Sequence, residues 1–438
     1  MSGTIADATG PAESAFLDLH KKFIADKNPE PGVCDLAQAA LARFEALGFP
    51  RSKHEMYTFA HTKNMVSTAF ALPAEAVVAK EVVPQNVYAG CENSVLVVVD
   101  GQYRPDLSDI SALADSLSHS SIAEALAEPA VKEYFLESIE EENDVFASLN
   151  SAFLGGGVAL KIADDVQPQA PLQILYVSTG SEAQAVVNHP RLFLRVGKLS
   201  ELKLIVRTVG VQGNYLVNAV QDILLDEGAG VTFSQVQEDR PDAWHFSKTR
   251  ITQQANSRFF GANASYGSRL TRHHYDARLQ AAGAELTLHG VSVLNDEEQV
   301  HNFIRIHHEA PHTTSSQLFK NIVDGKSRSS MDGTVIVCEG AQLVSSDQLI
   351  NNLMLSDEAH ADNKPNLMIF ADDVKCTHGA TVGQIDEEQL FYLKTRGLSE
   401  NIAKELLTRS FAESVIQTIE FPEVVADLQK NLLKKLQQ

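Results

Sequence analysis

The sequence predicts a mainly β core with helical segments at both ends, and three observations support this. Short β-branched runs recur between residues 144 and 385, for example at residues 173–178, 202–207 and 367–370. No helix-length amphipathic segment separates these runs, which argues against βαβ units. Before and after this region, apolar residues recur at the three-and-four spacing of amphipathic helices. The core is therefore expected to be a large all-β solenoid or sandwich, with a parallel β-helix as the more specific expectation.

The first region, residues 1–140, is predicted to be a helical domain. Its second helix is expected to end at Gly48, which precedes Phe-Pro. One strand-like run, residues 94–99, interrupts the region, and a helical stretch over residues 121–143 closes it. The apolar positions that predict the first two helices are Phe16, Leu19, Phe23, Leu36, Ala40, Leu41, Phe44 and Leu47.

The core region, residues 141–385, contains five Gly-Ala pairs between its apolar runs. A turn glycine followed by a small residue that enters the next strand suits the corners of a stacked, coiled sheet. The spacing of the pairs is irregular, so they are a weaker signal than a true repeat. They begin at Gly228, Gly261, Gly283, Gly340 and Gly379.

The last region, residues 386–438, is predicted to form three short amphipathic helices. Asp386 begins a pattern that resembles a capping box, and Gly397 is expected to end that helix. Ser399 is the expected cap of the second helix, and Pro422 suits the first turn of the third. Packing on the β core and docking of a partner both remain open for these helices.

The charge and composition exclude several classes of partner. The 36 Lys and Arg against 57 Asp and Glu give a net charge of −21, which disfavours nucleic acid and anionic membrane surfaces. Apolar runs such as residues 95–99 are far too short to span a membrane. Residues 1–7 have no basic start and no apolar stretch, so we expect no signal peptide and a cytoplasmic protein.

The pair Cys376 and His378 is the strongest candidate for chemistry. Side chains two residues apart on a strand leave the same face, so the thiolate and the imidazole should lie side by side. Such a pair makes half of a metal or iron–sulfur site, and the other ligands must come from elsewhere. A buried, inert thiol is the alternative for Cys376. The neighbouring Asp372 and Asp373 are expected to raise the pKa of this thiol.

Three other patterns resemble functional motifs but are expected to be structural. His308-Glu-Ala-Pro-His312 matches the zinc-protease signature, but Pro311 is incompatible with the helix that this site requires. Gly325-Lys-Ser resembles the end of a phosphate-binding loop, but the required upstream glycine is Lys320. Seven of the fifteen histidines fall between residues 273 and 312, where most are expected to be hydrogen-bonded or exposed residues without a metal.

Residues 365–397 closely resemble the SufB/SufD family of iron–sulfur cluster assembly proteins. This stretch has the sequence PNLMIFADDVKCTHGATVGQIDEEQLFYLKTRG, and further matches cover residues 311–320, 325–329 and 48–55. The continuation over residues 384–393 and the modest length are similar to the SufD branch of the family and not to the longer SufB branch.

The resemblance implies a right-handed parallel β-helix between N-terminal and C-terminal helical domains. It also implies a non-catalytic scaffold that pairs with a SufB-type paralogue and carries a SufC-type ABC ATPase on its C-terminal helices. Cys376 and His378 match family residues at the interface with SufB, where a transient iron–sulfur cluster is built, and the resemblance implies that this chain alone holds no cluster stably. An isolated chain could form a homodimer. The residues expected to contact the ATPase are Leu390, Phe391, Tyr392 and Arg396.

Two alternatives remain open. A β-helix enzyme that acts on carbohydrate, a lyase or hydrolase, would line the groove of the solenoid with catalytic acids and would need no partner. A SufB-type subunit that holds the cluster itself is disfavoured because the chain has only four, scattered cysteines.

Overall fold

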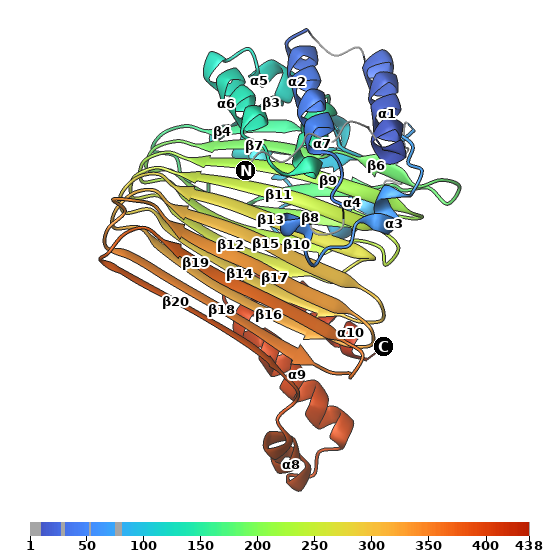
Figure 1. Cartoon of the computed structure of the whole chain (residues 1–438), viewed down its shortest axis with the longest axis vertical. Helices are drawn as coiled ribbons and strands as arrows, with labels where there is room; N and C mark the ends of the chain where they lie inside the picture. The colour runs from blue at the N-terminus through green and yellow to red at the C-terminus, as the bar shows by residue number, and fades with distance from the viewer. Residues whose placement is uncertain (1–9, 28–30, 52–53, 75–80, 438) are drawn as a thin grey trace.

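The computed structural model describes residues 10–27, 31–51, 54–74 and 81–437. It is a parallel β-helix with helices at both ends (Figure 1), which confirms the predicted fold class. Residues 1–7, on which the expectation of no signal peptide rests, lie outside the described residues.

Two long sheets form the β-helix, and the chain alternates between them. Sheet 1 consists, in spatial order, of β2 (Gln102–Tyr103), β1 (Val95–Val99), β5 (Leu172–Ser178), β8 (Glu201–Gly210), β10 (Gly230–Glu238), β12 (Arg258–Ser265), β14 (Glu285–Leu294), β16 (Thr314–Val323), β18 (Val344–Met354) and β20 (Val374–Gly383). Sheet 2 consists of β19 (His360–Ile369), β17 (Arg328–Val337), β15 (Gln299–His308), β13 (Leu270–Leu279), β11 (Trp244–Gln253), β9 (Tyr215–Leu225), β7 (Arg191–Val196), β4 (Val158–Ile162) and β3 (Leu117–Ser121), with β6 (Val186–Asn188) also paired to β9.

The pairing between coils is parallel and closely in register. In sheet 1, Arg258 pairs with Glu285, Glu285 with Thr314 and Thr314 with Ser345, so successive coils advance the chain by 27, 29 and 31 residues. Antiparallel pairing occurs between β1 and β2 and between β3 and β4, at the N-terminal end. Each coil therefore depends on the next for its backbone hydrogen bonds, as in other solenoids.

The helices of the N-terminal region cover the first coils. They are α1 (Pro11–Lys27), α2 (Pro31–Leu47), α3 (Lys63–Val66), α4 (Val82–Asn86), α5 (Ile122–Ala125), α6 (Pro129–Glu140) and α7 (Val145–Ala152), with 3-10 turns at Glu55–Tyr57, Pro105–Leu107 and Ser111–Leu113.

Three predictions for this region are confirmed. Gly48 has a φ of 62° directly after α2, as expected for a helix stop, and the strand-like run is β1, which joins sheet 1 beside β5. The helical stretch expected over residues 121–143 consists of two helices, α5 and α6. Pro129 has no amide hydrogen to continue the first helix and occupies the first turn of the second.

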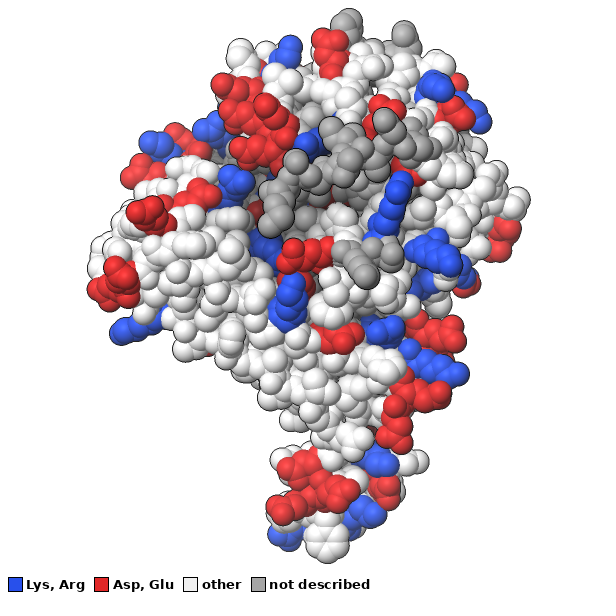
Figure 2. Space-filling model, in the orientation of Figure 1, with Lys and Arg blue, Asp and Glu red and all other residues white. Residues whose placement is uncertain are grey.

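The three C-terminal helices form as predicted, but only part of them packs on the β-helix. They are α8 (Glu387–Thr395), α9 (Glu400–Ile416) and α10 (Pro422–Leu436). The Asp386 side chain accepts hydrogen bonds from the backbone of Glu388 and Gln389, and Gly397, with a φ of 90°, follows α8. The second half of α9 and one face of α10 pack on the outer face of sheet 1, whereas α8 projects from the molecule (Figure 1). Charged side chains of both signs cluster on α8 and over the N-terminal helices (Figure 2).

The Gly-Ala pairs have two different roles. Gly228, Gly283 and Gly340 lie in turns with φ values of 69°, 75° and 83°, as expected for corner glycines. Gly261 and Gly379 lie inside β12 and β20, so their predicted corner role is wrong. At Gly261 a Cβ would collide with the side chains of Phe259 and Leu288, so close packing requires a glycine there.

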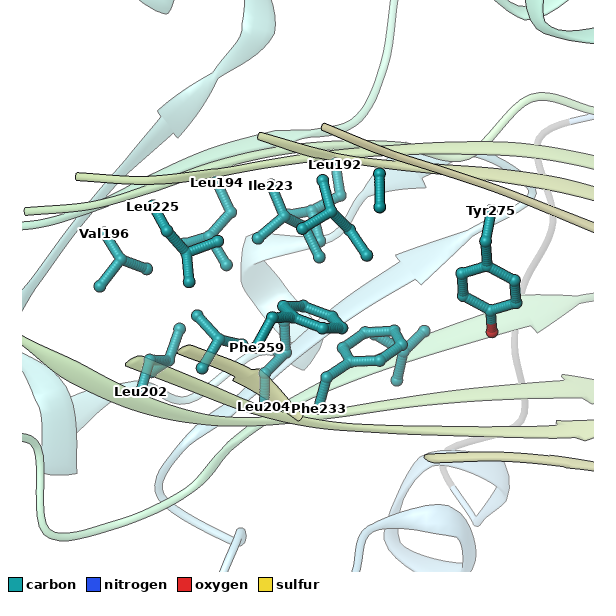
Figure 3. Packing of buried hydrophobic residues seen from close by; sticks show 14 of the residues in the cluster. Leu192, Leu194, Val196, Leu202, Leu204, Ile223, Leu225, Phe233, Phe259 and Tyr275 are labelled. Atoms are coloured by element: carbon teal, nitrogen blue, oxygen red, sulfur yellow. The ribbon is translucent and has the colours of Figure 1, made fainter. Parts of the chain in front are cut away.

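The interior of the β-helix is filled by apolar side chains from both sheets. Leu192, Leu194 and Ile223 of sheet 2 face Phe233 and Phe259 of sheet 1 across the lumen (Figure 3). Each of these side chains is almost completely buried. Burial of one such side chain contributes about 1.5–3 kcal/mol, so this layer is a main source of stability.

A buried ionic layer attaches the N-terminal region to the outer face of sheet 2. Glu142 and Asp144, which precede α7, are almost fully buried. Glu142 binds Lys248 at 2.7 Å and also pairs with Arg250, and Asp144 binds Arg272 at 2.9 Å. The layer comprises Glu142, Asp144, Asp222, Lys248, Arg250 and Arg272.

Removal of one carboxylate from the ionic layer should be strongly destabilising. Glu142→Ala leaves Lys248 and Arg250 without their shared buried counterion, so the free energy of unfolding should fall by about 3–5 kcal/mol. Denaturant unfolding measures this change. Glu140→Ala, at an exposed position of α6, is the matched control and should leave the midpoint unchanged. Equal stability of Glu142→Ala and the wild type would contradict the assigned role.

Buried neutral histidines should make the protein sensitive to mild acid. Burial lowers the pKa of His189 and His301 to about 3, and burial together with the charge of Lys248 lowers that of His274 to about 4. In the unfolded chain these groups titrate near pH 6.5, so below that pH the unfolded state binds protons that the native state does not. The free energy of unfolding should therefore fall by up to about 1.4 kcal/mol per pH unit for each histidine as the pH drops below about 6.5.

Denaturant midpoints measured between pH 7.5 and pH 5 test this expectation. A stability that is constant across this range would show that the buried histidines do not control it.

Candidate functional site

The C-terminal end of the β-helix is formed by two outermost strands. Within the described residues, β19 pairs only with β17 and β20 pairs only with β18. One edge of each strand therefore presents backbone N–H and C=O groups that no neighbouring strand binds. Unlike the inner strands, β19 and β20 contain no fully buried residue. This end of the β-helix is open to another strand.

Cys376 and His378 lie on β20 and face inward, toward the end of the lumen. Cys376 is in register with Ser346 and His378 with Gln348, and both of these partners have buried side chains. Asp347, which lies between these two partners on β18, is exposed, so the alternation of the sheet places Cys376 and His378 on one face. The prediction that both residues lie on one face of a strand is confirmed. Cys376 is half-buried and His378 is exposed.

The pKa of the Cys376 thiol is raised, as predicted, but for a different reason. Burial against the last coil raises this pKa, and a hydrogen bond from the backbone of Ser346 opposes the shift. The carboxylates of Asp372 and Asp373, expected to be the cause, do not contribute to it. The free thiol is therefore a poor nucleophile at neutral pH, and a positive metal ion would be needed to favour the thiolate.

The pair alone cannot complete a metal site. No group of three or more His, Cys, Asp and Glu side chains among the described residues is placed to hold a metal ion. The other cysteines lie elsewhere: Cys34 in α2, Cys91 before β1 and Cys338 in the turn after β17. Any cluster bound at Cys376 and His378 must therefore take its remaining ligands from outside the described part of this chain.

The apparent zinc-protease signature is a strand end followed by a turn. His308 is the last residue of β15, and His312 lies in the next turn with a φ of 59°. The two ring nitrogens of His308 form hydrogen bonds with Thr313 at 2.7 Å and Ser315 at 2.9 Å. Gly325 likewise lies in a turn, with a φ of 59°. These motifs are structural, as predicted.

The predicted partner-binding residues lie on the projecting helix α8. None of the residues of α8 is buried, and Phe391 and Tyr392 are 69% and 55% exposed. Leu390 is half-buried, and Arg396 at the C-terminus of α8 donates a hydrogen bond to the Tyr392 hydroxyl at 3.1 Å. An exposed aromatic pair on a helix that packs on so little of the molecule is typical of a docking surface.

Two further apolar residues extend this surface and were not predicted. Ile402 and Leu406, on the first half of α9, are 50% and 44% exposed. Val415, nine residues after Leu406 and therefore on the opposite side of α9, is buried against sheet 1. Helical periodicity alone cannot show which of these apolar residues the β-helix covers. We call Phe391, Tyr392, Ile402 and Leu406 the arm surface.

A cleft of about 840 Å³ lies on the outer face of sheet 2, beside α6. It was not predicted from the sequence. Its acids are largely engaged by cations. Although burial disfavours a charged Glu142, Lys248 and Arg250 hold its pKa below the usual value. A carboxylate of this kind is not suited to be the general acid of a glycosidase, which needs a raised pKa.

Comparison with known proteins identifies the family. A model of the SufBD core domain of the SUF system for FeS cluster assembly matches residues 177–411, and a model of the SufBD protein N-terminal region matches residues 13–174. The chain belongs to the SufBD family of iron–sulfur cluster assembly proteins. This confirms the family predicted from residues 365–397 and favours cluster assembly over a carbohydrate-active enzyme.

The similarity to SufBD relatives extends over nearly the whole chain. The chain is 26% identical over 416 residues to iron–sulfur cluster assembly protein SufD of Escherichia coli, covering 93% of each chain. It is 28% identical over 395 residues to a SufBD family protein of Synechocystis sp., covering 87% of this chain and 86% of the relative. It is 31% identical over 308 residues to the chloroplastic protein ABCI7 of Arabidopsis thaliana, covering 68% of this chain and 64% of the relative. The SufBD assignment gives the chain a role in iron–sulfur cluster assembly.

In the described parts of the chain, we find no helix that is both long and apolar enough to cross a membrane.

Proposed function

We propose that this chain is a non-catalytic scaffold that builds a nascent iron–sulfur cluster jointly with a SufB-type paralogue. The observation that carries the proposal is the position of Cys376 and His378, side by side on the outermost strand at the open end of the β-helix. The cluster is the cargo of this site, and the chain supplies one thiolate and one imidazole toward it.

The form of the open end supports a protein partner there. The free edges of β19 and β20 can pair with the strands of a second β-helix, which would satisfy their backbone groups. The strands at this end carry few charges, namely Asp347, Asp362, Lys364 and Lys375, and the corresponding side of the molecule is mostly uncharged (Figure 2). A paralogue with the same fold would bring the missing ligands across the contact. In the absence of the paralogue, a second copy of this chain can cover the same edges as a homodimer.

The arm surface supports a second partner, a SufC-type ABC ATPase. Its apolar side chains lie on α8 and the first half of α9, away from the β-helix (Figure 1). The second half of α9 is buried against sheet 1, so a force applied to α8 is transmitted to the β-helix. Closure of two ATPase copies on ATP binding would strain this arm and rearrange the contact at the open end, exposing Cys376 and His378 to iron and sulfur.

Substitution of either proposed ligand should abolish cluster formation but not assembly. In Cys376→Ala and His378→Ala, the complex with the paralogue and the ATPase should still co-purify, because neither side chain is fully buried. Iron and acid-labile sulfide bound to the complex should fall to background. Cys338→Ala, which removes another half-buried thiol, is the matched control and should retain wild-type yield. Wild-type cluster yield in both ligand variants would refute the proposed site.

Truncation of the aromatic pair on α8 should weaken the ATPase contact alone. Phe391→Ala combined with Tyr392→Ala should lower the affinity for the ATPase at least tenfold, as expected for two exposed aromatic anchors. The melting temperature should not change, because α8 contains no buried residue. Leu136→Ala, which removes an exposed apolar side chain from α6, is the control and should bind the ATPase normally. Unchanged ATPase affinity in the double variant would show that the ATPase docks at another surface.

A further inference from the structure

The inward-facing column that ends at His378 changes from apolar to polar near the open end. In sheet 1, His378 is in register with Gln348, Gln348 with Gln317, and Gln317 with Leu288. Deeper in the lumen this column continues through Gly261 to Phe233. The two positions next to His378 in this column, Gln348 and Gln317, therefore carry amide side chains, whereas the deeper positions of the column are apolar.

Gln348 is buried, and only part of its amide is paired. The side chain is 1% exposed, and its Nε2 donates a hydrogen bond to Oε1 of Gln317 at 3.3 Å. Its Oε1 has no hydrogen-bond partner among the described residues. An unpaired buried carbonyl oxygen destabilises a fold, so this atom requires an explanation.

Close packing holds the Gln348 side chain in place across the lumen. A Cβ added at Gly333 of β17, in the opposite sheet, would collide with Nε2 of Gln348. The amide therefore occupies space that the glycine leaves free. Gln317 on one side and Gly333 on the other restrict its position.

His378 is the neighbour best placed to use the free oxygen. Adjacent strands lie about 4.8 Å apart, so residues in register on the same face are within reach of each other's side chains. A histidine that binds a metal through one ring nitrogen usually donates the N–H of the other nitrogen to an oxygen atom. That hydrogen bond fixes the tautomer and the orientation of the ring.

We propose that Gln348 is a positioning residue for His378. Its Oε1 accepts the ring N–H of His378 when iron binds, and the second ring nitrogen is left unprotonated and directed at the open end. Gln317 has an indirect role, because its hydrogen bond holds the Gln348 amide in the orientation that directs Oε1 toward His378. This inference rests on the proposed role of His378 as a ligand.

The test measures metal binding to the complex of the full chain with its SufB-type paralogue. Co²⁺ serves as the probe because its ligand-field absorption reports the ligands and their geometry without cluster assembly. Gln348→Leu keeps the approximate size of the side chain but removes the accepting oxygen, so Co²⁺ affinity should fall about tenfold and the absorption band should change. Gln348→Glu retains an accepting oxygen and should restore affinity to within about threefold of the wild type.

Two further variants separate this inference from a general effect on folding and from the proposed function. Gln317→Leu makes the same change one coil deeper and should affect Co²⁺ affinity less than Gln348→Leu. Equal losses in the two leucine variants, or a wild-type affinity and spectrum in Gln348→Leu, would overturn the positioning role. If His378→Ala weakens Co²⁺ binding while Gln348→Leu does not, only the inference about Gln348 fails. If His378→Ala also binds Co²⁺ normally, the proposed ligand role of His378 fails with it.

Discussion

Parallel pairing of the backbone from coil to coil is the constraint on which the structure depends. An inner strand such as β16 is bonded on both sides, by β14 and β18, and no coil can satisfy its backbone alone. At the N-terminal end, the antiparallel strands β2 and β3 and the helices cover the sheets. At the other end, in the described part of the chain, β19 and β20 have no further neighbour. The two ends are therefore not equivalent, and Cys376 and His378 lie at the end that can still bind a partner.

The two helical regions are attached to the β-helix in different ways, and this difference suits the proposed scaffold role. The N-terminal region is fixed by buried ion pairs, among them Asp144 with Arg272 and Glu142 with Lys248. Such pairs tolerate little displacement, because separation of the charges would leave them buried and unpaired. The C-terminal region is attached to the β-helix through α10 and half of α9. Helix α8 makes its main contacts with α9. A rigid core with one projecting arm can pass a movement of the arm to the open end.

The sequence was sufficient to predict the fold class and the placement of Cys376 and His378 on one face of a strand, but only part of the remaining detail. Local signals were reliable where one residue determines the backbone, as at Gly48, Gly397 and Asp386. They failed at Gly261, whose role depends on a side chain from the neighbouring coil. The pair Cys376 and His378 was visible because strand alternation is a local rule. The unpaired oxygen of Gln348 could not be predicted, because register between coils is set by tertiary packing.

The alternation of the last strand also restricts how such a chain can evolve. Because successive side chains of β20 face opposite sides, insertion or deletion of one residue before Cys376 within the strand would turn both proposed ligands to the outer surface. The loop of residues 370–373 can absorb such a change only if the register between β18 and β20 is kept. Insertions and deletions among relatives should therefore be concentrated in the turns between strands, and the spacing between the two proposed ligands should vary little.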